Sequence, residues 1–358
     1  MIGMGFHKNQ MLKYQERGYS YIDKVACEFC VGDYALKQFI ANNGKNKICD
    51  YCSKDNVCID VESLIGKIMD GISHEYEEAA NCMSVEKGEY IGACTWDTHD
   101  LMHEKLADVM ELNNELLEDI VKTMDLTSWC EKDPYQLRQS RERVSMWNAF
   151  TEMVKKNTRY VFFRMHKKEN YYEDLPFLIL DHIGEGAKKL DLIKKLPRGT
   201  KFYRGRMHDN TKTIKYDCEL SSPPHEKAKS NRMSAEGIAV FYGANDILTT
   251  ITEIYDSKYK YATIAAFENL NDLQILDLTE IEKIPFPSLF DEDRWMHREP
   301  LKFFRKLTEN LTRPIDVMKN IEYIPAQIVA EYFRFLCTYD NKPIDGIAYG
   351  SSKPQGGI

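Results

Sequence analysis

Two short cysteine pairs near the start of the chain constrain its fold more than any other feature. Cys27-x-x-Cys30 and Cys49-x-x-Cys52 are separated by 18 residues. Each two-residue loop can direct two thiolates at one ion, and two such loops complete a tetrahedral site. Zn²⁺ suits four sulfur ligands, and a site with four protein ligands has no open position for a substrate. The spacing therefore predicts a structural zinc knuckle.

The alternative is two unrelated pairs of buried thiols. Cys58 lies nearby but is surplus to a four-ligand site. The remaining cysteines are read as isolated core thiols: Cys82, Cys94, Cys130, Cys218 and Cys337. Ten cysteines in a cytoplasmic chain are expected to be mostly reduced, so a cluster of them favours a metal over disulfides.

Charge and hydropathy exclude several classes of partner. The net charge is −8 and the pI about 5.7, with Lys and Arg scattered among acidic residues, so we do not expect nucleic acid as the main partner. No stretch reaches the ~20 apolar residues that span a bilayer. The first residues, 1–14, are polar and lack the apolar core of a signal peptide. We therefore expect a cytoplasmic protein with no membrane partner.

An apolar repeat at helical spacing follows the cysteines, and Asp60 stands where a helix N-cap is expected. The repeat consists of Val61, Leu64, Ile65, Ile68 and Ile72. Similar patterns predict one long helix over 99–124 and further helices over 134–155 and 172–190. The chain up to about residue 196 is therefore expected to be a zinc knuckle that leads into a helical bundle.

The pattern changes at the turn signal formed by Pro197 and Gly199. Strand-like runs over 201–204, 238–242, 261–267 and 273–278 then alternate irregularly with helical segments over 245–255 and 325–336. Such an order is typical of an α+β domain with short strands. The sequence predicts three parts: an N-terminal segment with the knuckle (1–60), a helical domain (61–196) and the α+β domain (197–358).

Polar side chains in the last part suit a dinucleotide whose glycosidic bond breaks. Arg204 ends a strand and offers a planar fork for phosphate oxygens. Tyr242 can stack on a heteroaromatic ring, and Glu253 can stabilise positive charge on a sugar. Ser351 lies in a Gly/Ser turn. Taken singly, Arg204 is better interpreted as a surface ion-pair residue and Glu253 as an ordinary charge on a helix face.

The order and spacing of these segments resemble the RES family, which is named for its Arg, Glu and Ser. Glu253 follows Tyr242 by eleven residues, and the similarity runs from about Lys201 to the end of the chain. The segments that carry the resemblance are Tyr203-Arg204, Arg232-Met233-Ser234, Phe241-Tyr242, Glu253, Pro325-x-Gln327 and Asp345-Gly346-Ile347-x-Tyr349-x-Ser351. RES proteins resemble ADP-ribosyltransferases in fold and act as bacterial toxins that deplete NAD⁺ by releasing nicotinamide.

The resemblance implies roles for named residues. Arg204 would bind the phosphates, Tyr242 would pack on the nicotinamide or ribose, and Glu253 would be the catalytic carboxylate. The implied catalytic set is Arg204, Tyr242, Glu253 and Ser351, and the further cofactor-binding candidates are Tyr203, Arg206, Arg232 and Ser352. Core packing is the alternative for Tyr203 and for Phe241. The polar insertion over 207–230 is a candidate lid. The sequence stops seven residues after Ser351, where the resemblance leads us to expect another strand.

The front half resembles the HEPN-like domain that precedes RES in some proteins, including Cys27-x-x-Cys30-Val31-Gly32-Asp33. It lacks the Arg…His pair of a HEPN ribonuclease, since Arg138, Arg141 and Arg143 are followed by Asn148 and no suitably spaced His. His99 and His103 share a helix face, but Asp100 stands where a zinc protease needs Glu. RNA cleavage and proteolysis are therefore not expected.

The resemblance implies an enzyme that cleaves NAD⁺ at the nicotinamide–ribose bond, as a glycohydrolase or phosphorolase, and the cysteine pairs predict a structural Zn²⁺. Such an enzyme harms its host, so an antitoxin or regulatory partner is implied, as in toxin–antitoxin or phage-defence systems. The N-terminal domain is a candidate for that control, and an oligomer is left open. Two alternatives stay open: an ADP-ribosyltransferase that modifies a protein, and a non-enzymatic zinc-dependent binding protein.

Overall fold

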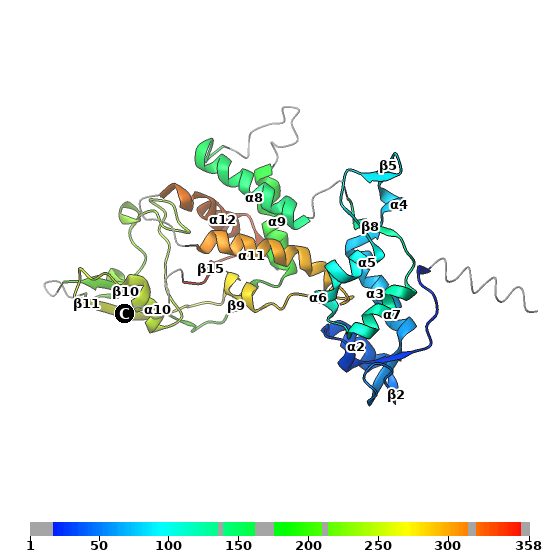
Figure 1. Ribbon diagram of the computed structural model, residues 1–358. Coiled ribbons are helices and arrows are strands. Elements are labelled where there is room, and N and C mark those ends of the chain that lie inside the picture. The colour runs from blue at the N-terminus through cyan, green and yellow to red at the C-terminus, as the bar shows by residue number, and fades with distance from the viewer. Residues whose placement is uncertain (1–16, 135–138, 162–174, 210–213, 314–319, 352–358) are drawn as a thin grey trace, which may run out of the picture. The chain divides into compact units, whose positions relative to one another are not determined.

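The computed structural model describes residues 17–134, 139–161, 175–209, 214–313 and 320–351, and it divides into two compact units (Figure 1). The first unit consists of Met1–Arg138 and Phe286–Arg298, and the second of Gln139–Pro285 and Glu299–Ile358. The first unit therefore contains a piece of the C-terminal part of the chain. We call this piece, residues 286–298, the docked segment. The mixture of helices and small sheets confirms an α+β protein.

The first unit contains short helices, one longer helix and three small antiparallel sheets. Its helices are α2 (Tyr34–Asn43), α3 (Val61–Glu75), α4 (Ala79–Cys82), α5 (Thr98–Asp100), α6 (Ala107–Met110) and α7 (Asn114–Thr123). Its strands are β1 (Val25–Cys27), β2 (Lys45–Ile48), β3 (Asp55–Asp60), β4 (Tyr76–Glu78), β5 (Ser84–Glu86), β6 (Glu89–Ile91), β7 (Thr95–Asp97) and β8 (Ser128–Glu131). The strands pair in the orders β1–β3–β2, β4–β8–β7 and β5–β6. This part is thus less purely helical than the sequence predicts.

The centre of the first unit is α3, whose predicted start is confirmed. The Asp60 carboxylate accepts a hydrogen bond of 2.9 Å from the Ser63 amide, which satisfies one of the otherwise unbonded amides at the helix start. The apolar repeat of α3 is completely buried at Leu64, Ile65 and Ile68. An amphipathic helix of this kind is stabilised mainly by burying its apolar face.

The docked segment completes the core around α3. Leu289 and Phe290 are each 1% exposed and belong to the same apolar cluster as α3. Gly71 on α3 makes this packing sterically feasible, because a Cβ there would lie 2.2 Å from the Phe290 ring. Burying two such side chains removes enough apolar surface from water to contribute several kcal/mol, on the order of 1.5–3 each.

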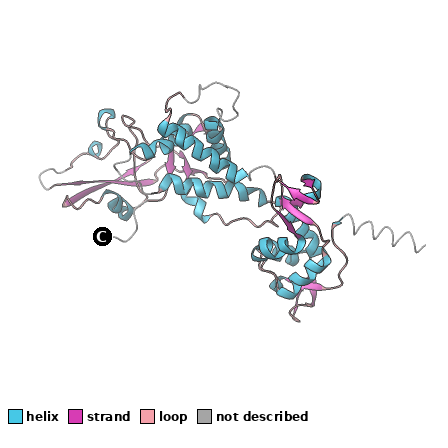
Figure 2. Cartoon of the chain, turned by 45° about the horizontal axis from the view of Figure 1, so that its top comes forward, coloured by secondary structure: helices cyan, strands magenta, loops and turns pink. Residues whose placement is uncertain are grey.

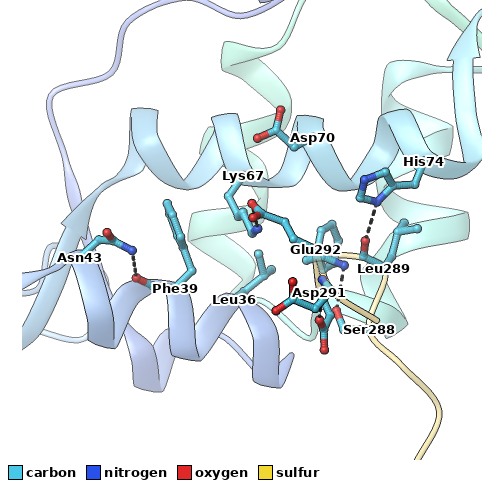
Figure 3. Close-up of polar contacts among 12 residues, drawn as sticks. Leu36, Phe39, Asn43, Lys67, Asp70, His74, Ser288, Leu289, Asp291 and Glu292 are labelled. Carbon is cyan, nitrogen blue, oxygen red and sulfur yellow. Dashed lines mark hydrogen bonds and ion pairs between the residues drawn. The ribbon is translucent and has the colours of Figure 1, made fainter. Parts of the chain in front are cut away.

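Polar contacts hold the same segment on both sides of its apolar anchor (Figure 3). The Lys67 ammonium lies 2.5 Å from the Glu292 carboxylate, and a His74 ring nitrogen lies 3.1 Å from the Leu289 carbonyl oxygen. His74 also stacks on Trp295, with ring centroids 4.1 Å apart. The segment ends in the ion pair between Arg298 and Glu75, at 2.7 Å, in which both side chains are mostly buried.

The prediction of one continuous helix over 99–124 is wrong. After α5, a π-helical turn (Leu101–Leu106) and α6, the helix stops at Glu111, which has a left-handed φ of 48°. Asn113 then caps α7 by accepting a hydrogen bond of 2.9 Å from the Glu115 amide. Met110 and Leu116 are both fully buried in one core, so the apolar repeat continues across the break and conceals it.

The second unit combines helices with one three-stranded sheet, one long two-stranded sheet and one short two-stranded sheet (Figures 1 and 2). Its helices are α8 (Gln139–Lys156), α9 (Leu175–Lys189), α10 (Ile247–Ile254), α11 (Arg298–Thr312, of which Arg298 belongs to the first unit) and α12 (Ile324–Phe335). Its strands are β9 (Ile193–Leu196), β10 (Lys201–His208), β11 (Tyr261–Glu268), β12 (Leu273–Asp277), β13 (Thr338–Tyr339), β14 (Lys342–Pro343) and β15 (Gly346–Ala348). Helices α8, α9 and α12 pack against one another.

Three of the four predicted strands of the second unit are confirmed, as β10, β11 and β12, whereas β9, β13, β14 and β15 were not predicted. β10 pairs antiparallel with β11, and β12 pairs parallel with β15 and antiparallel with β9. The predicted strand over 238–242 is wrong: this stretch is extended without ladder partners among the described residues. Only the following Ala244 forms a bridge, with Tyr203, through two hydrogen bonds of 2.8 Å. The division into 1–60, 61–196 and 197–358 stays a prediction.

The candidate lid over 207–230 contains the end of β10 and two 3₁₀-helices, Asp217–Glu219 and His225–Lys227. A His225 ring nitrogen lies 3.0 Å from the Gly237 carbonyl oxygen, which ties the end of this stretch to the chain after it. A role as a lid stays a prediction. Within the described ranges, the structure has no helix whose length and apolarity would let it cross a bilayer.

Candidate functional site

Arg204 lies in the middle of β10, opposite Ala265 of β11. Its guanidinium is half-buried, donates a hydrogen bond of 3.3 Å from Nη1 to the Tyr242 carbonyl, and lies 5.2 Å from the centroid of the Phe241 ring. Burial, and then repulsion from Arg206, lower its pKa from the usual value. No carboxylate of the described residues forms an ion pair with Arg204. A half-buried cation in this state favours an anionic ligand.

Helix α10 packs directly on β10 at Gly205. A Cβ at Gly205 would lie 2.7 Å from the Ile254 side chain and 3.3 Å from that of Thr250, so the close packing requires glycine. The Thr250 hydroxyl donates a hydrogen bond of 3.2 Å to the Tyr203 carbonyl. The helix begins at Asp246, whose carboxylate accepts a hydrogen bond of 2.7 Å from the Thr249 amide. These contacts fix α10, and with it Glu253, beside the strand that carries Arg204.

Glu253 and Ser351 come together although 98 residues separate them in the chain. The Ser351 hydroxyl donates a short hydrogen bond to the Glu253 carboxylate, and both side chains are exposed. Ser351 is brought there by β15, which pairs in register with β12 from Gly346 to Ala348. The Glu253 carboxylate is thus oriented by the Ser351 hydroxyl and remains accessible to a substrate.

The Tyr242 hydroxyl is fixed by the turn that contains Met233 and Ser234. It accepts a hydrogen bond of 3.2 Å from the Met233 amide and lies 3.1 Å from the Ser234 hydroxyl. Burial raises the pKa of Tyr242, although the hydrogen bonds from Ser234 and Met233 oppose that rise. The phenol therefore stays neutral at physiological pH, and its ring has a defined position beside Arg204.

The other cofactor-binding candidates differ in how free their side chains are. Arg232 donates from Nη1 to the carbonyls of Leu311 and Arg313, at 2.7 and 2.9 Å, so part of its guanidinium binds the C-terminal end of α11. Arg206 is exposed, and Tyr203 is half-buried. Ser352 lies outside the described residues.

The site includes two residues to which the sequence analysis gave no role. Tyr349 is half-buried, and burial, followed by the influence of Tyr242, raises its pKa to about 12. Arg232 and Glu253 also act on it electrostatically, so Tyr349 lies among the candidate residues. The second is Gln327 on α12, which binds the turn that holds Tyr242. Both residues belong to the RES-like motifs quoted above, and membership in these motifs was the sequence signal that could have identified them.

The four cysteines of the predicted knuckle converge on one point. Cys27 and Cys30 lie at the end of β1 and in the 3₁₀-helix Glu28–Cys30, and Cys49 and Cys52 lie in the turn between β2 and β3. Their sulfur atoms all lie within 4.8 Å of one another. The distances are 3.8 Å for Cys27–Cys30, 3.6 Å for Cys27–Cys52 and 3.7 Å for Cys30–Cys49.

These distances fit a tetrahedral zinc ion. With Zn–S bonds of about 2.3 Å, a tetrahedron places its sulfur atoms about 3.8 Å apart. Cys58, opposite Cys27 in the sheet, instead donates to the carbonyls of Lys47 and Asn56 at 3.3 and 3.4 Å. The four cysteines can therefore hold a metal ion, and Cys58 is not needed for it.

His99 and His103 do not form a comparable site. Their rings stack with centroids 4.2 Å apart, and His103 lies 3.5 Å from the Glu118 carboxylate. The possible ligand atoms of Asp97, His99 and Asp100 lie within 4.8 Å of one another, with Asp100 partly buried and the other two residues exposed. The arrangement agrees with the interpretation as a polar helix face.

Comparison with known proteins divides the chain into two matched regions. Residues 42–168 match the family model HEPN/RES N-terminal domain 1, and residues 203–357 match the family model RES domain. The second match covers Arg204, Tyr242, Glu253 and Ser351. The first begins between the two cysteine pairs and includes only the second pair. Neither a curated protein nor a solved structure shows significant similarity to the chain.

Proposed function

Since the chain is a RES-domain protein with a HEPN/RES N-terminal domain, we propose that its second unit cleaves NAD⁺ into nicotinamide and ADP-ribose. RES domains form a family of toxin-like, NAD-utilising enzymes. The observation that carries the proposal for this chain is the hydrogen bond between Ser351 and Glu253. Glu253 lies on α10 and Arg204 on β10, and these two elements pack against each other.

The reaction needs little covalent chemistry from the protein. The bond between ribose C1′ and the nicotinamide nitrogen breaks, and its electron pair leaves with nicotinamide. Positive charge then develops on the ribose, where the Glu253 carboxylate stabilises it, and Ser351 orients that carboxylate. Water adds to C1′ and loses a proton, which gives ADP-ribose; phosphate takes the place of water in a phosphorolase. Arg204 binds the pyrophosphate, and Tyr242 packs against the nicotinamide or ribose.

The proposal extends to a structural Zn²⁺ in the first unit. The ligands are Cys27, Cys30, Cys49 and Cys52, and the convergence of their sulfur atoms supports this set. Four thiolates saturate the ion, so it stabilises the fold of the sheet β1–β3–β2 and takes no part in the reaction.

The first unit is proposed to control the second. An enzyme that depletes NAD⁺ is harmful to the cytoplasm in which it acts, so its activity requires restraint by an antitoxin, a trigger or an attached domain. The docked segment supports control by the attached N-terminal domain, because this part of the C-terminal chain belongs to the core of the first unit.

The role of Glu253 is tested by the Glu253→Gln variant. The amide keeps the size of the side chain and loses the negative charge, so kcat is expected to fall about 10²–10³-fold while the melting temperature is unchanged. Glu268→Gln is the matched control, since Glu268 is exposed on β11 and pairs only weakly, at 3.6 Å, with Lys201. Equal turnover by Glu253→Gln and the control would refute the assignment.

The acceptor of ADP-ribose separates hydrolysis from protein modification. With NAD⁺ labelled in the ADP-ribose part, a glycohydrolase or phosphorolase releases the label into the small-molecule fraction. An ADP-ribosyltransferase leaves it on a macromolecule instead.

A further inference from the structure

Gln327 is a buried polar side chain in the second unit, 8% exposed, on the first turn of α12. Its amide nitrogen lies 3.0 Å from the Ser230 hydroxyl, 2.8 Å from the Asn231 carbonyl and 3.1 Å from the Ser234 carbonyl. The amide nitrogen of Gln327 therefore lies within hydrogen-bond distance of three oxygen atoms of a single turn. Asn231 and Ser234 also form a bridge to each other, so the turn is a compact unit held from α12.

This turn is the same one that fixes Tyr242. The Met233 amide and the Ser234 hydroxyl both contact the Tyr242 hydroxyl, at 3.2 and 3.1 Å. The backbone carbonyl of Tyr242 in turn accepts the hydrogen bond from Arg204. Hydrogen bonds therefore link Gln327 to the turn, the turn to the Tyr242 hydroxyl, and the Tyr242 backbone to Arg204. Met233 and Ser234 are buried, at 8% and 4% exposure, so water does not readily replace these bonds.

We propose that Gln327 is a positioning residue of the NAD⁺ site, which acts through residues 231–234 to fix Tyr242 and Arg204 for dinucleotide binding. The inference rests on the proposed function and adds a residue that touches neither the substrate nor the reacting atoms. Glutamine suits the role because its amide supplies two N–H donors at the end of a side chain long enough to reach the turn. Glutamate offers only acceptors to the same carbonyls when it is ionised.

The test is the Gln327→Met variant, which keeps the length of the side chain and removes both donors. Tyr242 and Arg204 bind the substrate in the ground state as well as in the transition state, so their displacement raises KM. We expect a KM for NAD⁺ about tenfold higher and a kcat within about threefold of wild type. A merely structural role would lower the fraction of folded enzyme, which reduces the apparent kcat and leaves KM unchanged.

The chain provides a matched control in Gln274 on β12. Its amide donates one hydrogen bond of 3.2 Å to the Tyr339 carbonyl, away from the turn. Gln274→Met is expected to leave KM within about twofold of wild type. If Gln327→Met does not fold, Ser234→Ala tests the same connection one step closer to Tyr242, and we expect it to raise KM about threefold.

A second readout does not depend on turnover. In protein carrying 3-fluorotyrosine at position 242, the ¹⁹F resonance reports the hydrogen bonds of the phenol. Gln327→Met is expected to shift or broaden this resonance, and Gln274→Met is not. An unchanged resonance and an unchanged KM in folded Gln327→Met would overturn the inference. Absence of turnover in the folded wild type would instead overturn the proposed function, and the role of Gln327 in an NAD⁺ site with it.

Discussion

At the scale of single residues, Arg204 most clearly distinguishes a binding site from ordinary surface. An arginine on a two-stranded sheet usually either extends into water or pairs with a carboxylate. Arg204 is half-buried, accompanied by Phe241 and the Tyr242 carbonyl, and has no carboxylate partner in the described ranges. Such a cation carries a desolvation penalty that an anionic ligand would relieve.

The Arg204→Lys variant tests this interpretation. Lysine keeps the charge and loses the planar fork that binds two phosphate oxygens at once, so KM for NAD⁺ is expected to rise about tenfold or more. Arg206→Lys is the comparison, because Arg206 is exposed on the same strand, and we expect its KM within about threefold of wild type. The opposite ranking in steady-state kinetics would transfer the phosphate-binding role to Arg206.

The residues of the site differ in how far sequence could predict them. Arg204, Tyr242, Glu253 and Ser351 were selected as candidates through the resemblance of their motifs to the RES family, and their catalytic roles stay predictions. The contact of Glu253 with Ser351 depends on the parallel pairing of β15 with β12, which no local pattern specifies. Gln327 gains its role only from the path of the 231–234 turn, so its motif alone indicated no function.

At the scale of secondary structure, apolar repeats and capping residues predicted an element correctly where one side of it faces the core. The apolar repeat of α3 with its Asp60 cap predicted that helix well. The same reasoning failed over 99–124, because two helices share one core and their apolar residues remain in phase. Asn113, a favourable N-cap residue followed by Glu115, was the local signal for the break.

The extended stretch 238–242 failed for a different reason. Its β-branched and aromatic residues are typical of a strand, but a strand also needs a neighbour with free backbone groups. β10 pairs along its whole length with β11 and leaves only a bridge at Tyr203 for Ala244. Tyr242 is instead held through its side chain, which is a tertiary contact that sequence patterns do not contain.

The cluster of Cys27, Cys30, Cys49 and Cys52 gives a prediction about the metal content of the protein. Purified protein is expected to contain about one zinc ion per chain, since four converging sulfur atoms fit one tetrahedral ion. Cys49→Ser is expected to lose the zinc and to unfold the β1–β3–β2 sheet. Cys58→Ser is the control and retains the metal, because Cys58 bonds to backbone carbonyls instead. Elemental analysis distinguishes the cases, and full zinc content in Cys49→Ser would contradict the ligand set.

At the scale of the whole molecule, the two units are connected by more than one passage of the chain. The docked segment returns from the C-terminal part into the core of the first unit, and α11 begins there with Arg298 and continues into the second unit. The end of α11 supplies the Leu311 carbonyl to Arg232. Residues 286–298 lie within the region that matches the RES domain. The sequence therefore assigns them to the C-terminal domain and does not indicate that they pack in the first unit.

The docked segment is expected to be essential for the stability of the first unit. Phe290→Ala removes a ring that is 1% exposed and leaves a cavity against Gly71, so it is expected to destabilise the first unit by about 3–5 kcal/mol. Met296→Ala, in the same segment but 55% exposed, is expected to change stability by less than about 0.5 kcal/mol. Hydrogen exchange of the α3 amides measures the effect, and unchanged protection in Phe290→Ala would exclude the docked arrangement.

The central claim is that this chain breaks the nicotinamide–ribose bond of NAD⁺, and proton NMR of a mixture of NAD⁺ and full-length, zinc-replete protein tests it most directly. The account predicts that free nicotinamide accumulates while NAD⁺ disappears in equal amount, and that neither change occurs with Glu253→Gln. Intact NAD⁺ after prolonged incubation with folded wild-type protein would contradict the account.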